Sequence, residues 1–228
     1  MSNPFRYFNS SPEVIRLVVM MYVRYPLSLR NVEDLLWTSA TRLSGSGGTV
    51  LAPMFAAEIR KKRVAHLRGC LQWRWHLDEV FVKVNGKLCY LWRAVDHESE
   101  VLEAVVTAKR DKTAALKLLK RLMKKYGAPS SVVTDGFRAY CAAMNEIRAA
   151  DRHEVGRRLN NRAENSHQPF RRRERAMQRF RSLKTLQKFS SVHGQVHNHF
   201  NQERHLVTRQ VYKQRRSTAL AEWRALAA

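Results

Sequence analysis

The sequence predicts an α/β fold built on a mixed β-sheet, and three observations support this fold class. Apolar and polar residues alternate with a period of two through most of residues 75–107, which favours three antiparallel strands. A β-branched run at 131–134 is typical of a buried parallel strand. Helical periodicity follows each of these segments, so a sheet with both strand orientations and helices packed on it is expected.

The composition indicates a folded protein with a polyanionic partner. The 228 residues include 42 Lys and Arg against 19 Asp and Glu, a formal net charge of +23, and 44% of them are hydrophobic. This hydrophobic content excludes a disordered basic tail, and the charge favours nucleic acid as the partner. Three cysteines without zinc-binding spacing, no signal-peptide pattern and a longest apolar run of only Leu17–Val23 predict a cytoplasmic, nucleoid-associated protein without a membrane partner.

Residues 1–68 are expected to form a helical DNA-binding module. Apolar residues at helical spacing predict a helix over 11–24 and a second, shorter one from Ser28, a pair that suggests a helix-turn-helix. A recognition helix should follow, but residues 41–49 include three Gly and two Ser in five consecutive positions, which favours a flexible linker. The region expected to hold the recognition helix, 38–51, is therefore atypical.

The core is expected over residues 69–181, and a basic helical extension over 182–228. Asn85-Gly86 is a strong hairpin turn, and Asp111 can cap a helix. The expected core strands are 75–84, 88–95, 101–107 and 131–134, and the expected core helices are 111–127 and 140–150. Two apolar stripes at helical spacing follow, Phe170, Met177, Phe180 and Leu183, then Leu186, Phe189, Val192, Val196 and Phe200.

Two basic helical segments are candidates for contact with DNA. The first is the helix expected over 56–68, and the second lies off the first apolar stripe. Each could instead be a solvated face, but in a chain of this charge DNA contact is favoured. The residues concerned are Arg60, Lys61, Lys62, Arg63, Arg171, Arg172, Arg173 and Arg175.

Two aspartates stand where an acidic residue needs an explanation. Alternation places Asp78 on one face of its strand with His76, Val80 and other apolar residues, where an unpaired carboxylate is costly. A bound divalent cation would offset this cost, and so would a salt bridge to an arginine. Asp135 follows the buried parallel strand directly, at the edge where α/β sheets bind ligands, although a turn or helix-cap role is an alternative.

Glu164 is the third candidate, in the first turn of the second basic helix. A glutamate at a helix N-terminus is also an ordinary stabilising feature. Arg171 lies seven residues on, two turns along the same face, so both side chains could touch one nucleic-acid strand. Three carboxylates suit Mg²⁺ or Mn²⁺, and two such ions can assist phosphodiester displacement.

These residues lie within motifs that resemble bacterial insertion-sequence transposases of the DDE type, specifically the IS-six (IS-twenty-six-like) group. The resemblance covers nearly the whole chain except about 37–51, and its motifs are specific in combination. The matching stretches are 73–79, 90–96, 133–136, 160–167, 170–175 and 197–201.

The resemblance implies an RNase H-like catalytic core in which Asp78, Asp135 and Glu164 are the catalytic metal ligands. It implies Mg²⁺- or Mn²⁺-dependent cleavage at the element's ends, with two ions, and then strand transfer by the freed 3′-hydroxyl in replicative, cointegrate-forming transposition. The partners it implies are the terminal inverted repeats, target DNA and further copies of the chain, as a homodimer or a larger synaptic complex. Arg171 matches the basic residue that the family has seven positions after its glutamate.

Two departures from the family pattern leave alternatives open. Only 28 residues separate Asp135 from Glu164, which is shorter than the common spacing and indicates a shorter insert before the helix. The family would place its recognition helix near 38–51, so recognition of the terminal repeats is expected to be impaired. The alternatives are a DNA-binding, transposition-defective copy that acts as a competitor, and an RNase H-like nuclease without strand transfer.

Two other groups of polar residues are expected to have structural roles or phosphate contacts, and not to bind a metal. The C-terminal histidines suggest zinc, but no Cys or well-spaced acidic ligand accompanies them, so core or phosphate-facing roles are expected. The acidic residues near 96–100 are expected to belong to a solvated turn. The residues concerned are His193, His197, His199 and His205, and Asp96, Glu98 and Glu100.

Overall fold

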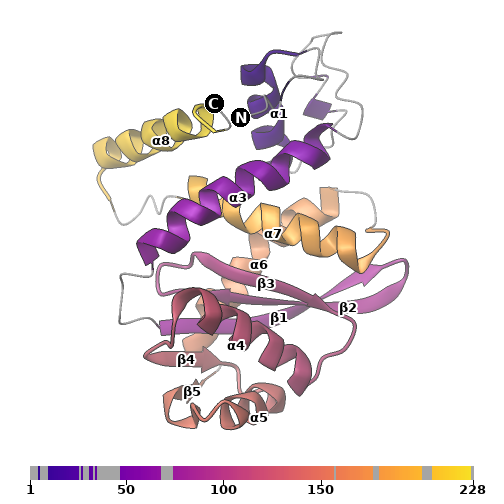
Figure 1. Ribbon diagram of the computed structural model, residues 1–228, viewed down its shortest axis with the longest axis vertical. Coiled ribbons are helices and arrows are strands. Elements are labelled where there is room, and N and C mark those ends of the chain that lie inside the picture. The colour runs from indigo at the N-terminus through magenta and orange to yellow at the C-terminus, as the bar shows by residue number, and fades with distance from the viewer. Residues whose placement is uncertain are drawn as a thin grey trace.

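A computed structural model shows a five-stranded mixed sheet with helices on both faces and a further helical layer (Figure 1). The order of the strands is β3-β2-β1-β4-β5. The sheet confirms the α/β class and the mixed strand orientation. The residues described are 5, 10–25, 27, 31–32, 34, 47–67, 74–156, 158–176, 180–201 and 207–226.

The first three strands form the expected antiparallel meander. The turn between β1 and β2 is Asn85-Gly86, with φ values of 48° and 79°, which is the backbone that Asn and Gly favour in a tight hairpin. The strands are β1 (Arg74–Val84), β2 (Lys87–Val95) and β3 (Val101–Thr107).

A parallel half completes the sheet. β4 (Ser131–Thr134) pairs parallel with β1, as its β-branched composition predicts. β5 (His153–Val155) pairs parallel with β4 and was not expected. It is only three residues long and follows the 3₁₀ turn Ala150–Arg152, so the helix expected over 140–150 is shorter, at α5 (Arg138–Glu146).

The helices of the core cover the two faces of the sheet. α4 (Lys112–Tyr126) begins at Asp111, whose carboxylate accepts a hydrogen bond from the Ala114 amide at 2.9 Å, and it packs with α5 on one face (Figure 1). α6 (Asn161–Ala176) and α7 (Leu183–Phe200) cover the other face. The two sides of β1 therefore face different helices, as strand alternation requires.

The second helical layer lies on the outer side of α7 (Figure 1). It consists of α1 (Pro12–Arg24), α3 (Gly47–Leu67) and α8 (Arg209–Arg224). α1 has the expected bounds. Val192, Val196 and Phe200 of α7 pack into this layer, while Leu186 packs towards the sheet, so α7 joins the two hydrophobic clusters.

Two expectations about helices are corrected. The linker expected over 41–49 is wrong at 47–49, because α3 begins at Gly47; Leu51, Phe55 and Ile59 bury an apolar stripe against the neighbouring helices, and this packing outweighs the low helix propensity of glycine. Residues 41–46, and most of the helix expected from Ser28, lie outside the described residues.

The first apolar stripe is not one helical stripe. Phe170 lies in α6, whereas Phe180 forms an isolated parallel bridge with Val84 of β1, and Leu183 is exposed. Met177 lies outside the described residues. The domain bounds at 68 and 181 stay predictions. None of the helices in the described part of the chain is both long and apolar enough to cross a membrane.

Candidate active site

Asp78 lies on β1, and Asp135 is the first residue after β4, the strand that pairs parallel with β1. Trp75 pairs with Val132 and His76 with Val133, so the same register continued by two residues brings Asp78 opposite Asp135. The negative charges of both carboxylates also contribute to raising the pKa of the Tyr140 hydroxyl. Asp135 directly follows β4, and its Oδ1 accepts the Phe137 amide at 3.0 Å.

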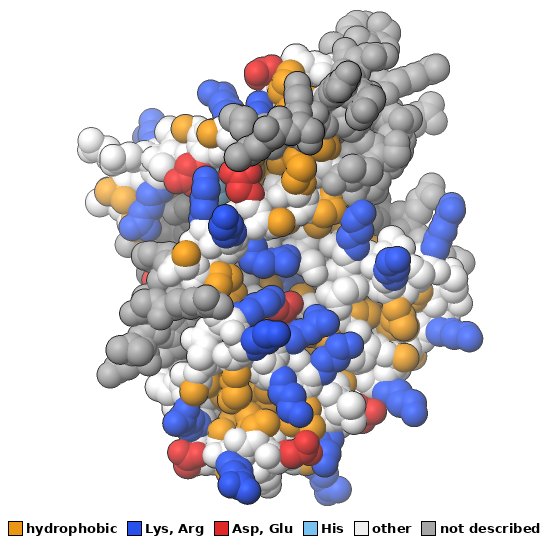
Figure 2. Space-filling model, in the orientation of Figure 1, with side chains coloured by type: hydrophobic (Ala, Val, Ile, Leu, Met, Phe, Trp, Pro, Cys, Tyr) orange, Lys and Arg blue, Asp and Glu red, His pale blue; other side chains and the backbone are white. Residues whose placement is uncertain are grey.

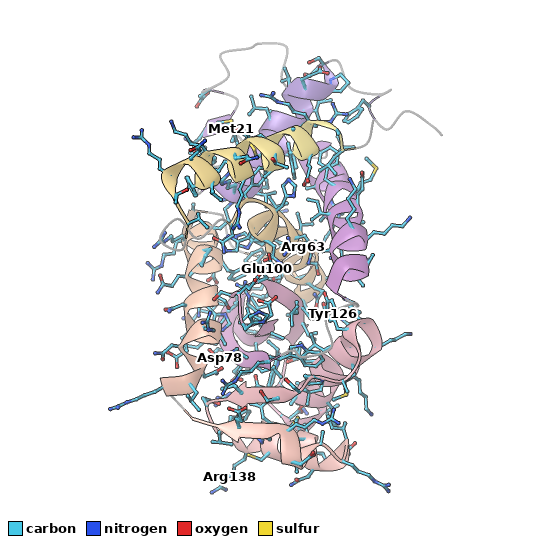
Figure 3. All side chains as sticks on the ribbon, turned by 90° about the vertical axis from the view of Figure 1, so that its left-hand side faces the viewer. Met21, Arg63, Asp78, Glu100, Tyr126 and Arg138 are labelled. Atoms are coloured by element: carbon cyan, nitrogen blue, oxygen red, sulfur yellow. The ribbon has the colours of Figure 1, made fainter. Side chains whose placement is uncertain are left out.

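Asp78 faces α6, beside which it lies in Figure 3. Its Oδ2 accepts a hydrogen bond from Nε2 of His167 at 3.1 Å. Burial lowers the pKa of His167, although the hydrogen bond to Asp78 opposes this shift. The cross-strand neighbour of Asp78 is Arg93, which is 2% exposed. Among the described residues, Asp78 is thus hydrogen-bonded to this histidine and makes no salt bridge to an arginine, which is the alternative to a metal site.

Glu164 is in the first turn of α6, on the face that also carries His167 one turn later. Its side chain is exposed. Within the part of the chain that the structure describes, no group of three or more His, Cys, Asp or Glu residues is placed to hold a metal ion. The register, continued past His76 and Val133, thus directs Asp78 and Asp135 to the same edge of the sheet, and Glu164 belongs to no three-residue ligand set among the described residues.

A second acidic group lies on the opposite face of β1, and the sequence analysis missed it. The side chain of Glu79 is 2% exposed and accepts hydrogen bonds from the Tyr140 hydroxyl at 2.8 Å and from Nε of Arg110 at 2.5 Å. Burial raises the pKa of Glu79 and, together with the neighbouring carboxylates, raises that of Tyr140 well above its usual value. Arg110 also lies over the ring of Phe137, at 3.7 Å. Strand alternation could have indicated this residue, because Glu79 and Asp78 are consecutive in β1 and therefore point to opposite faces of the sheet.

The arginines of α6 differ in their availability to DNA. Arg172 and Arg175 are exposed. Arg171 is partly occupied, since it donates to Glu174 Oε2 and to the Phe81 carbonyl, each at 2.6 Å. Arg173 is 1% exposed, and its Nε donates to the Tyr22 carbonyl at 2.7 Å, so its side chain is not on the outer surface.

The basic run of α3 is mostly accessible. Lys61 and Lys62 are exposed and Arg60 is half-buried, while Arg63 is paired with Glu100. Lys and Arg side chains are spread over much of the face in Figure 2, with few acidic side chains among them. This face has the charge needed for binding a phosphate backbone.

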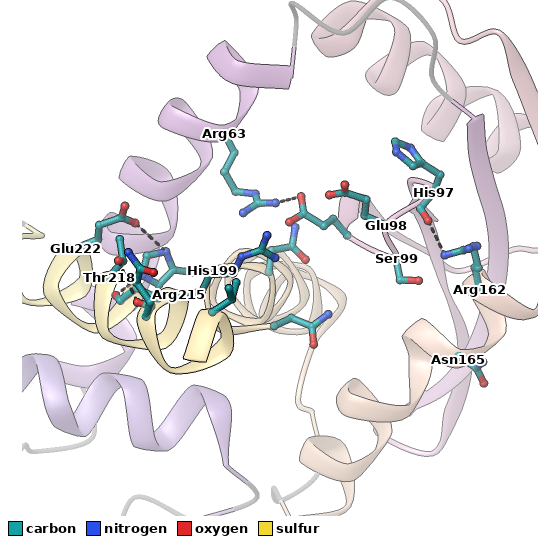
Figure 4. Close-up of a pocket in the computed structure, with 16 residues that line it drawn as sticks. Arg63, His97, Glu98, Ser99, Arg162, Asn165, His199, Arg215, Thr218 and Glu222 are labelled. Carbon is teal, nitrogen blue, oxygen red and sulfur yellow. Dashed lines mark hydrogen bonds and ion pairs between the residues drawn. The ribbon is translucent and has the colours of Figure 1, made fainter. Parts of the chain in front are cut away.

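A large pocket of about 1060 Å³ lies between α3, α8, the start of α6 and the turn that follows β2 (Figure 4). Arg63 and Arg162 point towards it, and Arg162 donates to the His97 carbonyl (Figure 4). Its lining is mixed in charge, since Glu98 and Glu222 also contribute.

The turn at 96–100 differs from the expected solvated turn at one residue. Asp96 is 2% exposed, and its Oδ1 accepts the amides of Glu98 and Glu100, each at 2.9 Å. Burial raises the pKa of Asp96 to about 6. Asp96 therefore anchors the turn between β2 and β3 from inside, because its carboxylate ties both amides to the end of β2.

Gly136 fixes the backbone next to Asp135, and Gly136→Ala tests this. Its φ is +91°, a left-handed conformation that residues with a Cβ rarely adopt, and an added Cβ would lie 2.8 Å from Cγ1 of Val155. We expect the variant to lose about 1–3 kcal/mol of unfolding free energy, measured by chemical denaturation. We also expect the variant to have lower enzymatic activity, because a shift of the backbone at residue 136 would move Asp135. Gly127→Ala, with a φ of +83° and open space around its Cβ, is the matched control for strain away from the site. Equal activity losses in both variants would contradict a local effect on Asp135.

Comparison with known proteins gives a consistent family. A family model described as a DDE domain matches residues 72–203. The chain is 31% identical over 194 residues to the transposase for insertion sequence-like element IS431mec of Staphylococcus aureus, covering 82% of this chain and 85% of the relative. The same identity and coverage hold for the transposase for insertion sequence element IS257 in transposon Tn4003 of Staphylococcus aureus. A solved simian T-cell lymphotropic virus intasome in complex with PP2A regulatory subunit B56 gamma matches with a TM-score of 0.36 and 20% identity, over 42% of this chain and 37% of that one.

Proposed function

The chain belongs to the DDE transposases of insertion sequences, in the IS-six group, and from this premise we propose that Asp78, Asp135 and Glu164 are its catalytic carboxylates. As a transposase it acts on DNA, by strand cleavage and strand transfer. The observation that supports the residue assignment is the register of β1 and β4, in which His76 pairs with Val133; continued by two residues, this register would bring Asp78 beside Asp135 at the carboxyl end of β4. Ligand sites of α/β sheets form at this edge.

The chemistry of the three side chains fits a divalent metal. Carboxylate oxygens are the ligands that Mg²⁺ and Mn²⁺ prefer. Two ions held by Asp78, Asp135 and Glu164 would supply Lewis-acid stabilisation of the attacking and leaving oxygens.

The remaining residues of the site bind and orient. His167 donates Nε2–H to Asp78 Oδ2, which fixes the orientation of that carboxylate while leaving Oδ1 for another ligand. The cations of the two basic segments, of which Lys61, Lys62, Arg172 and Arg175 are exposed, hold the phosphate backbone and raise the local concentration of DNA. We assign this role to Arg60, Lys61, Lys62, Arg63, Arg171, Arg172 and Arg175.

The proposed organisation follows the sequence. Residues 1–68 serve DNA binding, 69–181 carry the catalytic carboxylates and 182–228 are a basic helical extension. The DNA partners are the terminal inverted repeats and a target duplex, brought together in the cytoplasm by a homodimer or a larger synaptic complex.

The second candidate function is a DNA-binding, transposition-defective copy that competes for the element's ends. It is favoured by the Gly- and Ser-rich composition around 44–48, within the region where the family has its recognition helix. It predicts weak or unselective binding to the element's own ends in a gel-shift assay, and tight selective binding would contradict it.

The proposed function is tested with purified protein and a duplex that carries the terminal repeats. We expect strand-transfer products with Mg²⁺ or Mn²⁺, none after chelation with EDTA, and recovery when the metal is restored, because the carboxylates alone cannot stabilise the leaving oxygen. Binding of the duplex in EDTA is the control that separates loss of chemistry from loss of affinity. Products of equal yield in EDTA would contradict a metal-dependent site.

A further inference from the structure

A second, smaller pocket of about 290 Å³ lies where α1, α6 and α7 meet, and cationic or basic side chains dominate its lining. Arg24 comes from α1, Arg172 and Arg173 from α6, and His193 and His197 from α7. No Asp or Glu is among the described residues that line it. Three guanidinium groups thus converge on one hollow from segments far apart in the sequence.

Several nitrogen atoms at the base of this pocket are buried without a hydrogen-bond partner in the described structure. They are Nη1 and Nη2 of Arg173, which is 1% exposed, and Nδ1 of His193, which is 3% exposed. Arg93, the cross-strand neighbour of Asp78, does not line the pocket, but it is 2% exposed, has no hydrogen-bond partner among the described residues for its three guanidinium nitrogens, and acts electrostatically on both histidines. The Arg173 guanidinium lies over the Tyr22 ring at 4.4 Å, which compensates part of its charge but leaves both Nη atoms without an acceptor. Burying unpaired donors is costly, and an anion in the pocket would offset that cost.

The pKa values of His193 and His197 are lowered in part by the positive charges around the pocket. Burial, together with the charges of Arg93 and Arg24, lowers the pKa of His197 to about 4. Burial, with Arg93, His197 and Arg173, lowers the pKa of His193 well below its usual value. Both rings are therefore neutral at neutral pH, and each can donate one N–H to an anion.

We propose that this pocket binds a phosphate group of the DNA backbone. The inference rests on the proposed function for the source of the phosphate, and on the pocket itself for the anion. Arg172 is exposed and Arg24 half-buried, whereas Arg173 is buried, so Arg24 and Arg172 would contact the phosphate and Arg173 would add positive charge from its buried position. Guanidinium groups suit phosphate because they donate two parallel hydrogen bonds.

The position of the pocket on α6 favours DNA over a free anion. Arg172 lies eight residues after Glu164 on the same helix, which is about 12 Å along its axis. This length corresponds to roughly three to four nucleotides of a duplex, at about 3.4 Å per nucleotide. Arg172 is also turned about 80° around the helix axis from Glu164, so a strand that places its scissile phosphate at the carboxylates would reach the pocket by following the helix around its axis.

The first test compares DNA affinity over a range of salt concentrations, in EDTA, for Arg24→Gln, Arg172→Gln and the wild type. Losing one phosphate contact should reduce the slope of log affinity against log salt by about one and weaken binding equally for unrelated sequences. Arg121→Gln is the control, because Arg121 is an exposed arginine on α4, which packs on the other face of the sheet. Pocket variants with the wild-type slope, or a control that loses as much slope, would overturn the proposal.

The second test distinguishes the two sources of phosphate. Histidine ring signals of the wild type are followed by NMR during titration with inorganic phosphate and, separately, with a short duplex. We expect the His193 and His197 signals to move with the duplex at lower phosphate concentration than with inorganic phosphate, and not to move in Arg172→Gln. Signals that move only with inorganic phosphate would overturn the DNA source, and signals that move with neither would overturn the pocket.

These readouts separate the pocket from the proposed catalytic function. Neither experiment requires metal or strand transfer. If the pocket variants reduce the salt dependence of DNA affinity but the wild type has no strand-transfer activity, only the proposed function is contradicted. If the wild type transfers strands normally but the pocket variants leave the salt dependence unchanged, only the phosphate pocket is contradicted.

Discussion

Asp78→Asn is expected to reduce strand transfer by about a thousandfold or more while leaving the affinity for DNA nearly unchanged. Metal ligands contribute several kcal/mol to stabilising the transition state, and each ~1.4 kcal/mol corresponds to about a tenfold change in rate. Asparagine keeps the shape of the side chain and one oxygen for the hydrogen bond from His167, so folding should be little affected. Strand transfer on pre-cleaved ends measures the chemical step directly.

Asp135→Asn and Glu164→Gln are expected to have losses of the same order. Residues that act as one unit are not additive, so a double variant should lose little more than either single one. Asp151→Asn is the matched control, because Asp151 lies in the turn before β5 and its side chain is 76% exposed. Three variants as active as this control would contradict the assignment of the carboxylates.

Glu164 is the most informative of the three, since it lies outside any three-residue ligand set among the described side chains. A glutamate that only complements the helix dipole is worth about 0.3–1 kcal/mol of stability at an exposed site. In that case Glu164→Gln would lower the unfolding free energy slightly and leave strand transfer unaffected. A thousandfold loss of strand transfer with near-normal stability instead requires that the start of α6 approaches Asp78 and Asp135 when DNA and metal bind.

Four of the five strands and two members of the candidate site could be predicted because local patterns determine them, whereas the three-residue β5 could not. Alternation set the face of Asp78, and a β-branched run followed by Asp135-Gly136 marked the end of a parallel strand. The hairpin at Asn85 and the cap at Asp111 depend on residues within a few positions of each other.

Features that depend on packing between distant segments escaped prediction. α3 begins at Gly47 against the propensity of its first residues, because its apolar face packs on α7. The bonds from Arg110 and Tyr140 to Glu79 join residues 31 and 61 positions apart. Arg173 lies in a run of exposed arginines in the sequence, yet it is buried because α1 lies against that side of α6. A single sequence carries no signal for such contacts.

Trp92→Ala is the second prediction with a large expected effect, and it connects the core to the site. Trp92 of β2 is 0% exposed. Its indole Nε1 donates to the Thr107 hydroxyl at 2.8 Å, and its ring packs edge-on against Tyr140, with centroids 5.5 Å apart, and at 6.4 Å from Phe137. Removing a buried tryptophan side chain typically costs about 3–5 kcal/mol of unfolding free energy, through lost burial and the cavity that remains. Chemical denaturation should show a loss of this size.

The same variant should also affect strand transfer, because the two rings that Trp92 supports belong to the segment directly after Asp135. Phe137 and Tyr140 lie two and five residues beyond that carboxylate, and Tyr140 also holds Glu79. Trp92→Phe is the control: it keeps an aromatic ring in the core and loses the bond to Thr107, which is half-buried and can bond to water. We expect Trp92→Ala, assayed at a temperature where it remains folded, to lose more strand transfer than Trp92→Phe at equal DNA affinity. If the folded alanine variant were as active as the wild type, the aromatic cluster would stabilise the sheet without positioning Asp135.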